Sequence, residues 1–534
     1  MHGKIENISK ILLRMQLKPL FIHRPESLTI PEDSCLTEAM NKKRSPKTVL
    51  AAGPSSKRGD LIELAVTALD EDGNGIGTHD GTNVHVIGAL PDERVRARLT
   101  HVGKRHLHAE AVEVLTPSRA RLAQPSCKRA GSCDGCPLIV MHYPDQLNWK
   151  RTFTERQIRR YQTLGAAEVL ATLPSPNQLH YRNSAKLVVS GTFRRPVIGI
   201  YRRNSHQVMD IGTCPLHHPL INRVVTAVKE GIAKCKVQVY NPRTGSGLLR
   251  YLVVRISERT GTAMAVFVTV ERNYNEIHHL AKHLQQSVPQ VEVVVQNVNS
   301  SEGNVILGQR DYFLTRQHAL TEELGGIRFT ISPRSFFQVN SGGARIIYET
   351  VRQWSSLTGK ESVVDLYCGI GGIALFLAGT AREVHGIEVV EAAVNDAESN
   401  ARLNRIHNCS FEAGDAAELI EELVEEGERL DLVVLNPPRK GCDAGVLNKV
   451  AAAGPARIVY VSCAPATLAR DLDILAGLGY ATLRVQPVDM FPQTPHVENI
   501  ALLVKKLPRN DRLESPAKER SRPRASHKAK GGAV

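Results

Sequence analysis

Residues 363–374 read Val-Val-Asp-Leu-Tyr-Cys-Gly-Ile-Gly-Gly-Ile-Ala. An apolar run reaches Asp365, a glycine-rich turn follows, and an apolar segment continues from Ile373 to Ala378. This pattern is typical of a buried parallel strand that passes into a helix in a doubly wound α/β domain. Glycines in such a turn, Gly369 among them, let the chain bend tightly and let a ligand approach the backbone. The stretch predicts a Rossmann-like domain with a cofactor site.

The next predicted strand, Val384 to Glu388, helps to identify the cofactor. Glu388 follows Asp365 by about 20 residues, the spacing at which such folds place an acid on a ribose diol. Dinucleotides also need a G-x-G-x-x-G turn that aims a helix at a pyrophosphate, and the third glycine is missing here. An acid before the glycines suits a cofactor with an amino group and a sulfonium. The sequence therefore favours S-adenosyl-L-methionine (SAM) over a nicotinamide dinucleotide.

Three more apolar runs of this domain, predicted to span 321–505, are followed by residues with polar or reactive side chains. Asp415 follows the third run and is predicted to meet the adenine amino group, and Asn436 follows the fourth within Asn-Pro-Pro-Arg. Cys463 follows the fifth, and Gln338 precedes the domain's first strand within reach of the cofactor. Because ligands of open α/β sheets gather at the carboxyl ends of the strands, these side chains are predicted to line one site.

The composition restricts the class of protein. The chain has 534 residues, enough for about three domains, and 42% of them are hydrophobic. No apolar run approaches the ~20 residues that cross a bilayer. A formal net charge of +14 favours a polyanionic partner such as RNA. Ten cysteines in so long a chain are not a secreted disulfide scaffold, so we expect a cytoplasmic monomer with reduced thiols.

The two ends of the chain do not resemble folded domains. Residues 1–52 are predicted to be a disordered extension or the product of a mis-assigned start codon. Residues 506–534 are polar, basic and proline-bearing, which predicts a disordered tail that adds non-specific RNA affinity or nothing.

Residues 53–117 carry several short alternating runs separated by turns such as Asp72-Gly73-Asn74-Gly75. This pattern predicts a small β-barrel of the oligonucleotide-binding kind. The stretch "GNGIG", followed by "VHVIGALPDERVRARL", resembles the TRAM domain, an RNA-binding module of RNA-modifying enzymes.

Residues 118–320 are predicted to form a central α+β domain that carries a metal centre. Cys127, Cys133 and Cys136 stand as C-x5-C-x2-C, and thiolates so close together on glycine-bearing turns converge on one centre. Cys214 is the candidate for a fourth ligand. Structural zinc sites usually use two paired knuckles, whereas a triplet with one distant cysteine favours an iron–sulfur cluster. Zinc remains the alternative.

The same domain interleaves basic and aromatic residues, an arrangement that suits an RNA-facing surface on which Arg meets phosphate and rings stack on bases. A solvated charged sheet face is the alternative interpretation. The residues are Tyr181, Arg182, Phe193, Arg194, Arg195, Tyr201, Arg202 and Arg203.

Cys463 has a chemical use beside a SAM site. The C5 carbon of uracil is not nucleophilic until a thiolate adds at C6, after which C5 can attack the SAM methyl group. A base must then remove the C5 proton so that the enzyme is released. Glu498, in a predicted loop before the last apolar strand, is the best candidate for this base.

Together these motifs resemble the RNA 5-methyluridine methyltransferases, specifically their iron–sulfur branch that acts on 23S ribosomal RNA. The likeness extends from about Gly59 to Lys505. It is carried by C-x5-C-x2-C, "FFQVN", "DLYCGIGG", "NPPRKG", "VSCAPATLARD" and "DMFPQTPHVE".

The resemblance implies a role for each of these positions. Cys463 is implied as the nucleophile and Glu498 as the proton-abstracting base. SAM-binding positions are implied at Gln338, Tyr367, Glu388 and Asn436. The ligands of a [4Fe-4S] cluster are implied at Cys127, Cys133, Cys136 and Cys214, where the cluster would hold the central domain to the RNA-binding surface without redox work.

The chain departs from the family pattern at two positions. Asn436 stands where Asp is usual, and Gly372 stands where Asn is frequent, which removes one polar contact to the cofactor. Asn-Pro-Pro also raises a rival hypothesis, methylation of an amino group of adenine or guanine in RNA, although an aromatic residue rather than Arg439 normally follows. A non-catalytic RNA-binding protein is the second rival. The sequence does not determine which RNA is modified; 23S ribosomal RNA is expected, with transfer RNA as the alternative.

Overall fold

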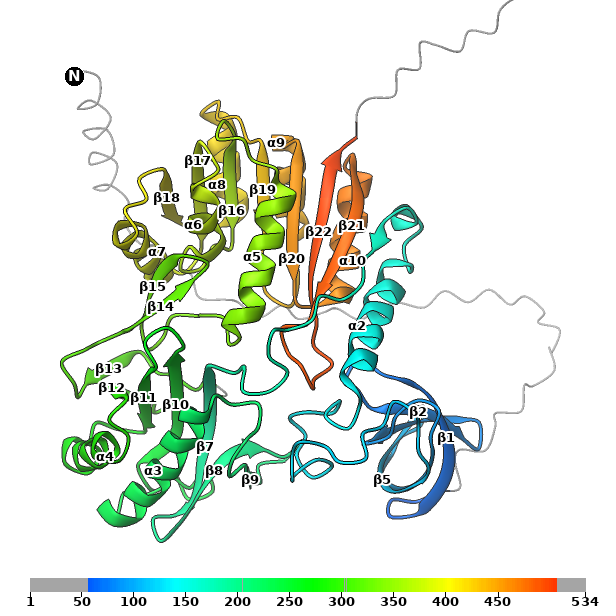
Figure 1. Ribbon diagram of the computed structural model, residues 1–534, viewed down its shortest axis with the longest axis vertical. Helices are drawn as coiled ribbons and strands as arrows, with labels where there is room; N and C mark the ends of the chain where they lie inside the picture. Colours follow the sequence, from blue (N-terminus) through cyan, green and yellow to red (C-terminus); the bar gives the residue numbers. More distant parts are fainter. Residues whose placement is uncertain (1–55, 204, 302, 304, 507–534) are drawn as a thin grey trace, which may run out of the picture. The chain divides into compact units, whose positions relative to one another are not determined.

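The computed structural model describes residues 56–203, 205–301, 303 and 305–506, all within the unit Pro54–Val534 (Figure 1). The predicted extension 1–52 and the tail from residue 507 onward lie outside the described residues.

The first element is a closed five-stranded barrel with the order β1-β2-β3-β5-β4 (blue in Figure 1). Its side chains alternate between the barrel core and solvent, as in β1, because successive residues of a strand point to opposite faces. The small barrel predicted from the alternating runs is therefore confirmed. The strands are β1 (Leu61–Leu69), β2 (Gly75–His79), β3 (Thr82–Ile87), β4 (Arg94–Val102) and β5 (His106–Thr116).

A connecting segment with the clustered cysteines leads to helix α2 (Tyr143–Ile158), which packs against α10 (Pro465–Gly477). A short 3-10 turn, η2 (Gln162–Leu164), and strand β6 (Glu168–Val169) follow. Strand β6 pairs with β21 (Tyr480–Val488), so this segment completes the edge of the C-terminal sheet.

The central domain is a seven-stranded sheet with the order β13-β12-β11-β10-β7-β8-β9. Helices α3 and α4 pack against each other and share one apolar core with the sheet. Helix α3 begins with Pro219 after the cap His218 and ends at Cys235, followed by the cap Lys236 in the left-handed region. The elements are β7 (Ser184–Thr192), β8 (Arg195–Tyr201), β9 (Val208–Asp210), α3 (Pro219–Cys235), β10 (Leu249–Ser257), β11 (Thr262–Thr269), α4 (Tyr274–Ser287), β12 (Val291–Val298) and β13 (Arg310–Phe313).

A two-stranded hairpin and a helix lead into the C-terminal domain. The elements are β14 (Leu320–Leu324), β15 (Ile327–Ile331) and α5 (Ser341–Ser355). The cap of α5 is Asn340, whose side chain accepts the Gly343 N–H at 3.0 Å.

The C-terminal sheet has the order β18-β17-β16-β19-β20-β22-β21-β6, and its first five strands are parallel. Strands β16 and β19 are buried along their whole length, as expected for central strands covered on both faces. The remaining elements are β16 (Ser362–Leu366), α6 (Gly372–Ala378), β17 (Glu383–Glu388), α7 (Glu391–Leu403), β18 (Cys409–Ala413), α8 (Ala416–Glu425), β19 (Leu432–Leu435), α9 (Ala444–Ala453), β20 (Arg457–Ser462) and β22 (Glu498–Lys505).

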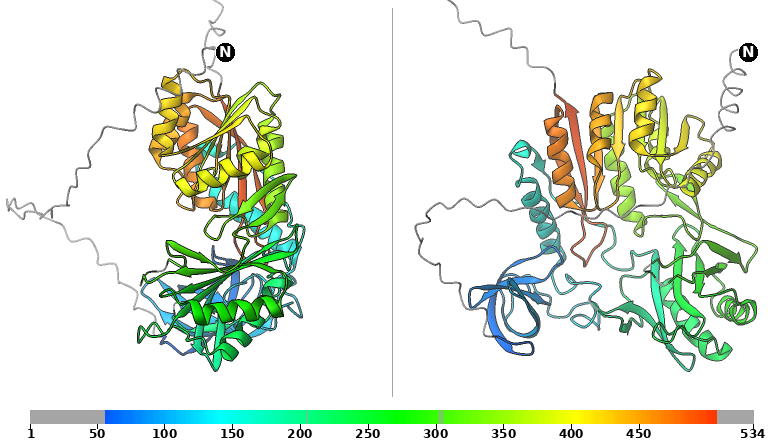
Figure 2. Two further views of the ribbon diagram at one scale, coloured as in Figure 1. Left: turned by 90° about the vertical axis from the view of Figure 1, so that its left-hand side faces the viewer. Right: turned by 180° about the vertical axis from the view of Figure 1, so that it is seen from behind.

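Helices cover both faces of this sheet, as the edge-on view in Figure 2 shows. One apolar core joins the sheet to α8, α9 and α10, and the other joins it to α5, α6 and α7. The doubly wound α/β domain predicted around residues 363–374 is therefore present. Helix α6 starts directly after the glycine turn, which places that turn at the carboxyl end of β16.

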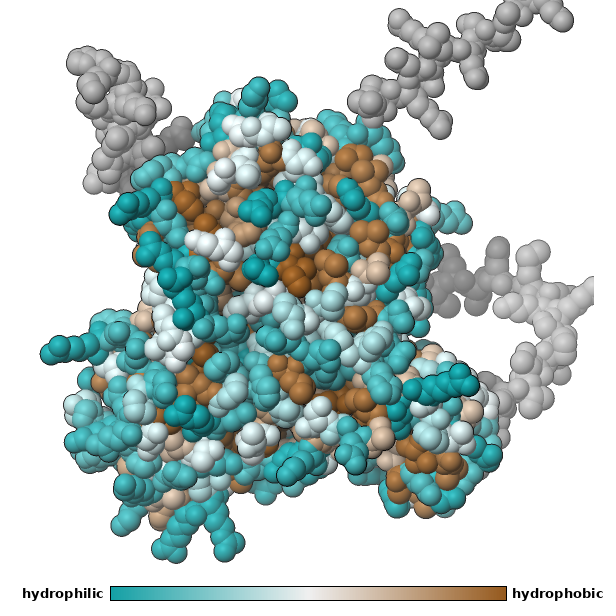
Figure 3. Space-filling view, viewed as in Figure 1, coloured by the Kyte–Doolittle hydropathy of each residue, from teal (hydrophilic) through white to brown (hydrophobic). Residues whose placement is uncertain are grey.

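Among the described residues, no helix has the length and apolarity that crossing a membrane requires. The face shown in Figure 3 is largely hydrophilic with scattered hydrophobic patches.

Candidate active site

The glycine turn after β16 is built on a buried carboxylate. Asp365 is fully buried, and its Oδ2 accepts the Ala374 N–H of α6 at 2.9 Å. Burial, with a smaller contribution from nearby Glu388, raises the pKa of Asp365 to about 7, against the hydrogen bond from Ala374. Tyr367, two residues on, has a φ of 63°, a left-handed conformation that a non-glycine residue adopts at a cost. The turn is therefore held in a fixed, strained shape.

Glu388 supports the same turn from the neighbouring strand. Its Oε2 accepts the Gly369 N–H and its Oε1 accepts the Val390 N–H, both at 3.1 Å. The carboxylate thus lies at the end of β17 beside the glycines, which is where a ribose diol is bound in folds of this kind.

A cavity opens over the turn, and five of the predicted cofactor residues line it: Gln338, Asp365, Tyr367, Gly369 and Asn436. The whole lining is Phe336, Phe337, Gln338, Tyr348, Asp365, Tyr367, Cys368, Gly369, Ile370, Gly372, Ile373 and Asn436.

Asp415, like Glu388, is one of the seven predicted cofactor residues but does not line this cavity. It does not end a strand, because β18 stops at Ala413. Its carboxylate accepts the N–H groups of Ala417 and Glu418 and so caps helix α8. An acidic residue two positions after a strand can be a cofactor ligand or a helix cap. The structure shows that Asp415 caps α8.

Tyr348 of α5 explains why residue 372 is glycine. A Cβ atom at this position would lie 2.4 Å from the Tyr348 hydroxyl oxygen. The hydroxyl occupies the space that an asparagine side chain would need, and it lines the same cavity. The polar group missing at residue 372 is therefore replaced by one from another helix, which the sequence pattern did not reveal.

Cys463 and Glu498 come together across two neighbouring strands. In the antiparallel pair β20–β22, Ser462 faces Asn499, so the next residues along each strand, Cys463 and Glu498, face each other. Glu498 is the first residue of β22 rather than part of a loop before it, and it is buried. The pairing of β20 with β22, which the sequence alone does not specify, thus places Cys463 opposite Glu498.

Arg439 is the third member of this group, and sequence reasoning did not assign it a role. Burial raises the pKa of the Cys463 thiol, as does Glu498, whereas the Arg439 guanidinium lowers it. Burial also raises the pKa of Glu498 to about 7, against the effect of Arg439. Arg439 directly follows two prolines at the end of a strand, and this position in the sequence could have indicated that it lies near the site.

The segment between β21 and β22 is anchored from helix α2. Lys150 and Asp489 form an ion pair in which both side chains are fully buried, and Lys150 Nζ also donates to the Phe491 carbonyl at 3.1 Å. Gln146, one turn earlier, donates to Gln493 Oε1 and accepts the Gln493 N–H, each at 2.9 Å. Helix α2 therefore fixes the segment that ends at Glu498.

The predicted RNA-facing surface of the central domain holds only in part. Tyr181 is buried and its hydroxyl donates to the Pro492 carbonyl at 3.0 Å, so it cannot stack on a base. Arg203 contacts the barrel turn through Asn74 at 3.3 Å, and its N–H donates to Asp134 at 2.9 Å. The exposed residues Arg194, Arg195, Tyr201 and Arg202 remain candidates.

The four predicted cluster ligands lie near one another. Burial raises the pKa of the Cys136 thiol, and Cys214, Cys133 and Cys127 each raise it further. The backbone of Cys214 is held by Asn222 of α3, which accepts its N–H at 3.1 Å and donates to its C=O at 2.9 Å. None of the nine cysteines in the described ranges forms a disulfide. Within these ranges no three His, Cys, Asp or Glu side chains are arranged to ligate a single metal ion.

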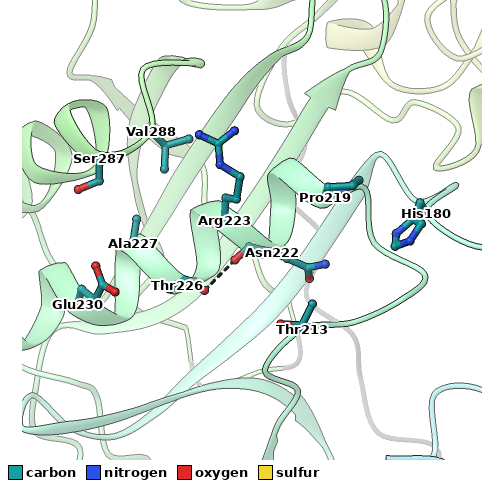
Figure 4. Close-up of a pocket in the computed structure, with 10 residues that line it drawn as sticks. All are labelled: His180, Thr213, Pro219, Asn222, Arg223, Thr226, Ala227, Glu230, Ser287 and Val288. Atoms are coloured by element: carbon teal, nitrogen blue, oxygen red, sulfur yellow. Dashed lines mark hydrogen bonds between the residues drawn. The ribbon is translucent and has the colours of Figure 1, made fainter. Parts of the chain in front are cut away.

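A larger hollow of about 500 Å³ lies elsewhere, against α3 and the end of α4 (Figure 4). His180, Asn222, Arg223 and Glu230 are among its lining residues, and none of the predicted catalytic or cofactor residues reaches it. The small cavity over the glycine turn remains the better candidate because it lies at the carboxyl ends of β16 and β19 and is lined by five of the predicted cofactor residues.

Comparison with known proteins agrees with this architecture. Residues 142–506 match the family model described as tRNA (Uracil-5-)-methyltransferase, and residues 55–112 match the TRAM domain. The chain is 39% identical over 447 residues to an uncharacterized RNA methyltransferase of Caldanaerobacter subterraneus, covering 84% of this chain and 98% of that one. A relative in Listeria innocua, also described as an uncharacterized RNA methyltransferase, is 38% identical over 454 residues, with 84% and 99% covered.

A solved structure is similar along most of the chain. It is the Pyrococcus abyssi tRNA (uracil-54, C5)-methyltransferase in complex with S-adenosyl-L-homocysteine, with a TM-score of 0.67 and 28% identity over 83% of this chain and 100% of that one. The family match, the relatives that align along most of the chain and the similar solved structure all agree with the resemblance found in the sequence. The chain belongs to the tRNA (uracil-5-)-methyltransferase family, SAM-dependent RNA methyltransferases, and carries a TRAM domain ahead of the methyltransferase region.

Proposed function

We propose that this enzyme forms 5-methyluridine through a covalent adduct between Cys463 and C6 of the target uracil. The observation that carries the proposal is the meeting of a half-buried thiol, a buried carboxyl group and a guanidinium at the carboxyl end of β20. Asn436, which lines the cofactor cavity, lies three residues before Arg439 in the same rigid Pro-Pro loop. This short separation along the loop supports a single site for the methyl acceptor and the methyl donor.

Cys463, Arg439 and Glu498 each have a separate role in the proposed reaction. The Cys463 thiolate, stabilised by Arg439, adds to C6 of uracil and makes C5 electron-rich. Bound SAM supplies an electrophilic methyl group, which C5 takes from the sulfonium sulfur. The Glu498 carboxylate then removes the proton from C5, the bond between Cys463 and C6 breaks, and the thiolate is regenerated. A proton is released for each methyl group transferred.

The pKa values set the pH dependence of this scheme. Glu498 acts as a base only when ionised, and its pKa is raised to about 7 by burial. Cys463 acts only as a thiolate, and burial raises its pKa above the ordinary value. Both groups are in their active forms at high pH, so kcat/KM is expected to rise with pH through 7 and to continue rising as the thiol ionises.

The test is methyl transfer from labelled SAM to unmodified ribosomal and transfer RNA, followed by nucleoside analysis. The wild type is expected to form 5-methyluridine, while Cys463→Ala binds RNA but transfers no methyl group. Turnover by Cys463→Ala contradicts the covalent mechanism. A methylated amino group on adenine or guanine would instead support the role of Asn436-Pro-Pro in a different reaction.

We further propose 23S ribosomal RNA as the substrate, because the resemblance is to the branch with clustered cysteines. The solved relative acts on transfer RNA, so the two RNAs are compared in the same assay. 5-Methyluridine in transfer RNA alone would overturn the ribosomal assignment and leave the chemistry unchanged.

We also propose that Cys127, Cys133, Cys136 and Cys214 hold a [4Fe-4S] cluster. The support is that all four are partly buried and that burial and neighbouring thiols raise the pKa values of Cys133, Cys136 and Cys214, while Asn222 holds the Cys214 backbone. Thiolates suit iron–sulfur clusters, and ligands of a four-iron cluster lie farther apart than those of a single ion. Anaerobically purified protein is expected to be brown and Cys133→Ser colourless. A colourless wild type containing zinc would overturn this assignment.

A further inference from the structure

The barrel carries four histidines on one outer face, which we call the histidine face: His85 on β3, His101 on β4, and His106 and His108 on β5. Strand pairing brings them together, since β3–β5 pairing sets His85 beside His108 and β4–β5 pairing sets His101 beside His108. The ring centroids of His85 and His108 are 5.3 Å apart and nearly stacked, and those of His101 and His108 are 5.9 Å apart. His106 lies 5.5 Å from His85.

The face is open to solvent. His101, His106 and His108 are exposed, and the His85 side chain retains 22% of its exposure. No group in the described ranges is arranged to ligate a metal ion, so the ring positions do not mark a metal site. Four imidazoles on an open surface present rings for stacking on bases and, when protonated, positive charge for phosphates.

The charged groups around the face are mixed. On the barrel, Asp70 from the β1–β2 turn accepts His85 Nδ1–H at 2.7 Å, and the exposed Lys104 and Arg105 precede His106 in the β4–β5 turn. Glu110 lies two residues beyond His108 and faces Arg98 of β4. The β2 residues that pair with β3 here are the uncharged Ile76 and Thr78. The surface therefore becomes strongly basic only when the imidazoles take up protons.

The β1–β2 turn links this face to the segment between β21 and β22, which leads to Glu498 and which we call the catalytic segment. Asp70 Oδ1 accepts the N–H groups of Asp72 and Asn74, which fixes the turn. A Cβ atom on Gly73, whose φ of 79° favours glycine, would lie 3.1 Å from Pro137 and 3.6 Å from Pro495. The turn that holds His85 thus packs against Pro495, three residues before Glu498 in the sequence.

We propose that the histidine face binds the phosphate backbone of the substrate RNA and takes up protons when the RNA binds. The inference rests on the proposed RNA substrate and adds the place and the proton linkage of the contact. In the free protein, burial lowers the pKa of His108, and His85, His101 and His106 lower it further, against Asp70. A phosphate stabilises the charged imidazoles and raises their pKa values, so affinity is high at low pH and falls as pH rises through the bound-state values.

The experiment measures the Kd of an unmodified 23S ribosomal RNA transcript for the full-length protein between pH 6 and 8 at constant ionic strength. Titration calorimetry in two buffers of different ionisation enthalpy counts the protons taken up. The wild type is expected to lose about tenfold in affinity over this range, as proton release from one or two imidazoles predicts. His106→Gln/His108→Gln is expected to bind weakly at pH 6 and to lose most of the pH dependence.

Two further variants make the test specific. His106→Lys/His108→Lys carries fixed charge and is expected to bind as tightly at pH 8 as at pH 6. His278→Gln/His279→Gln removes two histidines from helix α4 and is expected to behave as the wild type, and His496 is unchanged in every variant. An unaltered pH dependence in His106→Gln/His108→Gln, or an equal loss in the α4 variant, overturns the inference. Proton-linked RNA binding without 5-methyluridine formation would contradict the proposed function and leave this inference standing.

Discussion

Arg439 lowers the pKa of the Cys463 thiol and would favour the thiolate that the proposed reaction needs. Burial and Glu498 both oppose ionisation of the thiol, and Arg439 is the cation that favours it. Sequence reasoning predicted Cys463 and Glu498 from chemistry but missed Arg439, because the effect of a cation on a thiol depends on a distance that strand pairing sets.

Arg439→Gln is expected to raise the pKa of Cys463 and to slow its alkylation by iodoacetamide at pH 7.5 by about tenfold, since one pKa unit changes the thiolate fraction tenfold. Peptide mass spectrometry isolates Cys463 from the other thiols. Lys440→Gln removes the neighbouring exposed cation and serves as the control. Equal alkylation rates in wild type and Arg439→Gln would show that Arg439 does not stabilise the thiolate.

Gly372 and Tyr348 form a second residue-level pair. Gly372→Ala is expected to weaken SAM binding by about tenfold, because the new methyl group meets the Tyr348 hydroxyl and overpacking costs ~1–3 kcal/mol. Adding Tyr348→Phe removes the clashing oxygen and is expected to restore part of the affinity, as calorimetry would show. If Gly372→Ala binds SAM normally, the turn is more adaptable than its contacts indicate.

At the scale of elements, helix α2 acts as the support for the catalytic segment. Lys150 and Asp489 are both fully buried, and a buried charge is costly once its partner is removed. The pairing joins residues that are 339 positions apart, so no local sequence pattern indicates it.

Lys150→Met is expected to lower the free energy of unfolding by about 3–5 kcal/mol, because Asp489 is left buried and unpaired. Adding Asp489→Leu is expected to recover most of that loss, which urea denaturation measures. Arg151→Met, at an exposed position of the same helix, is the control. Full stability in Lys150→Met would contradict a stabilising role for this buried ion pair.

The accuracy of sequence reasoning also differs between elements. The strand ends at Asp365, Glu388, Asn436 and Cys463 were predictable because buried parallel strands are apolar runs with abrupt polar ends. Tyr181 was misinterpreted because its partner, the Pro492 carbonyl, lies 311 residues away. The histidine face was likewise hidden, since three strands must pair before its rings meet.

At the scale of the whole molecule, charge governs the encounter with RNA. The net charge of +14 places the enzyme among proteins that bind polyanions with release of counterions. KM for RNA is expected to rise with salt, with a log–log slope of about 0.7 for each phosphate contact to single-stranded RNA, while kcat stays constant. A KM that does not change between 50 and 300 mM KCl would mean that stacking and shape, rather than phosphate contacts, dominate RNA binding.

The packing of the Gly73 turn against Pro137 and Pro495 has a consequence for engineering and for evolution. A barrel that meets the rest of the chain only through a linker can be exchanged for that of a relative to redirect the enzyme to another RNA. Here the β1–β2 turn of the barrel packs directly against Pro495 in the segment between β21 and β22. A grafted barrel must therefore reproduce this turn, because a change in the turn would also change the packing around Pro495, three residues before Glu498.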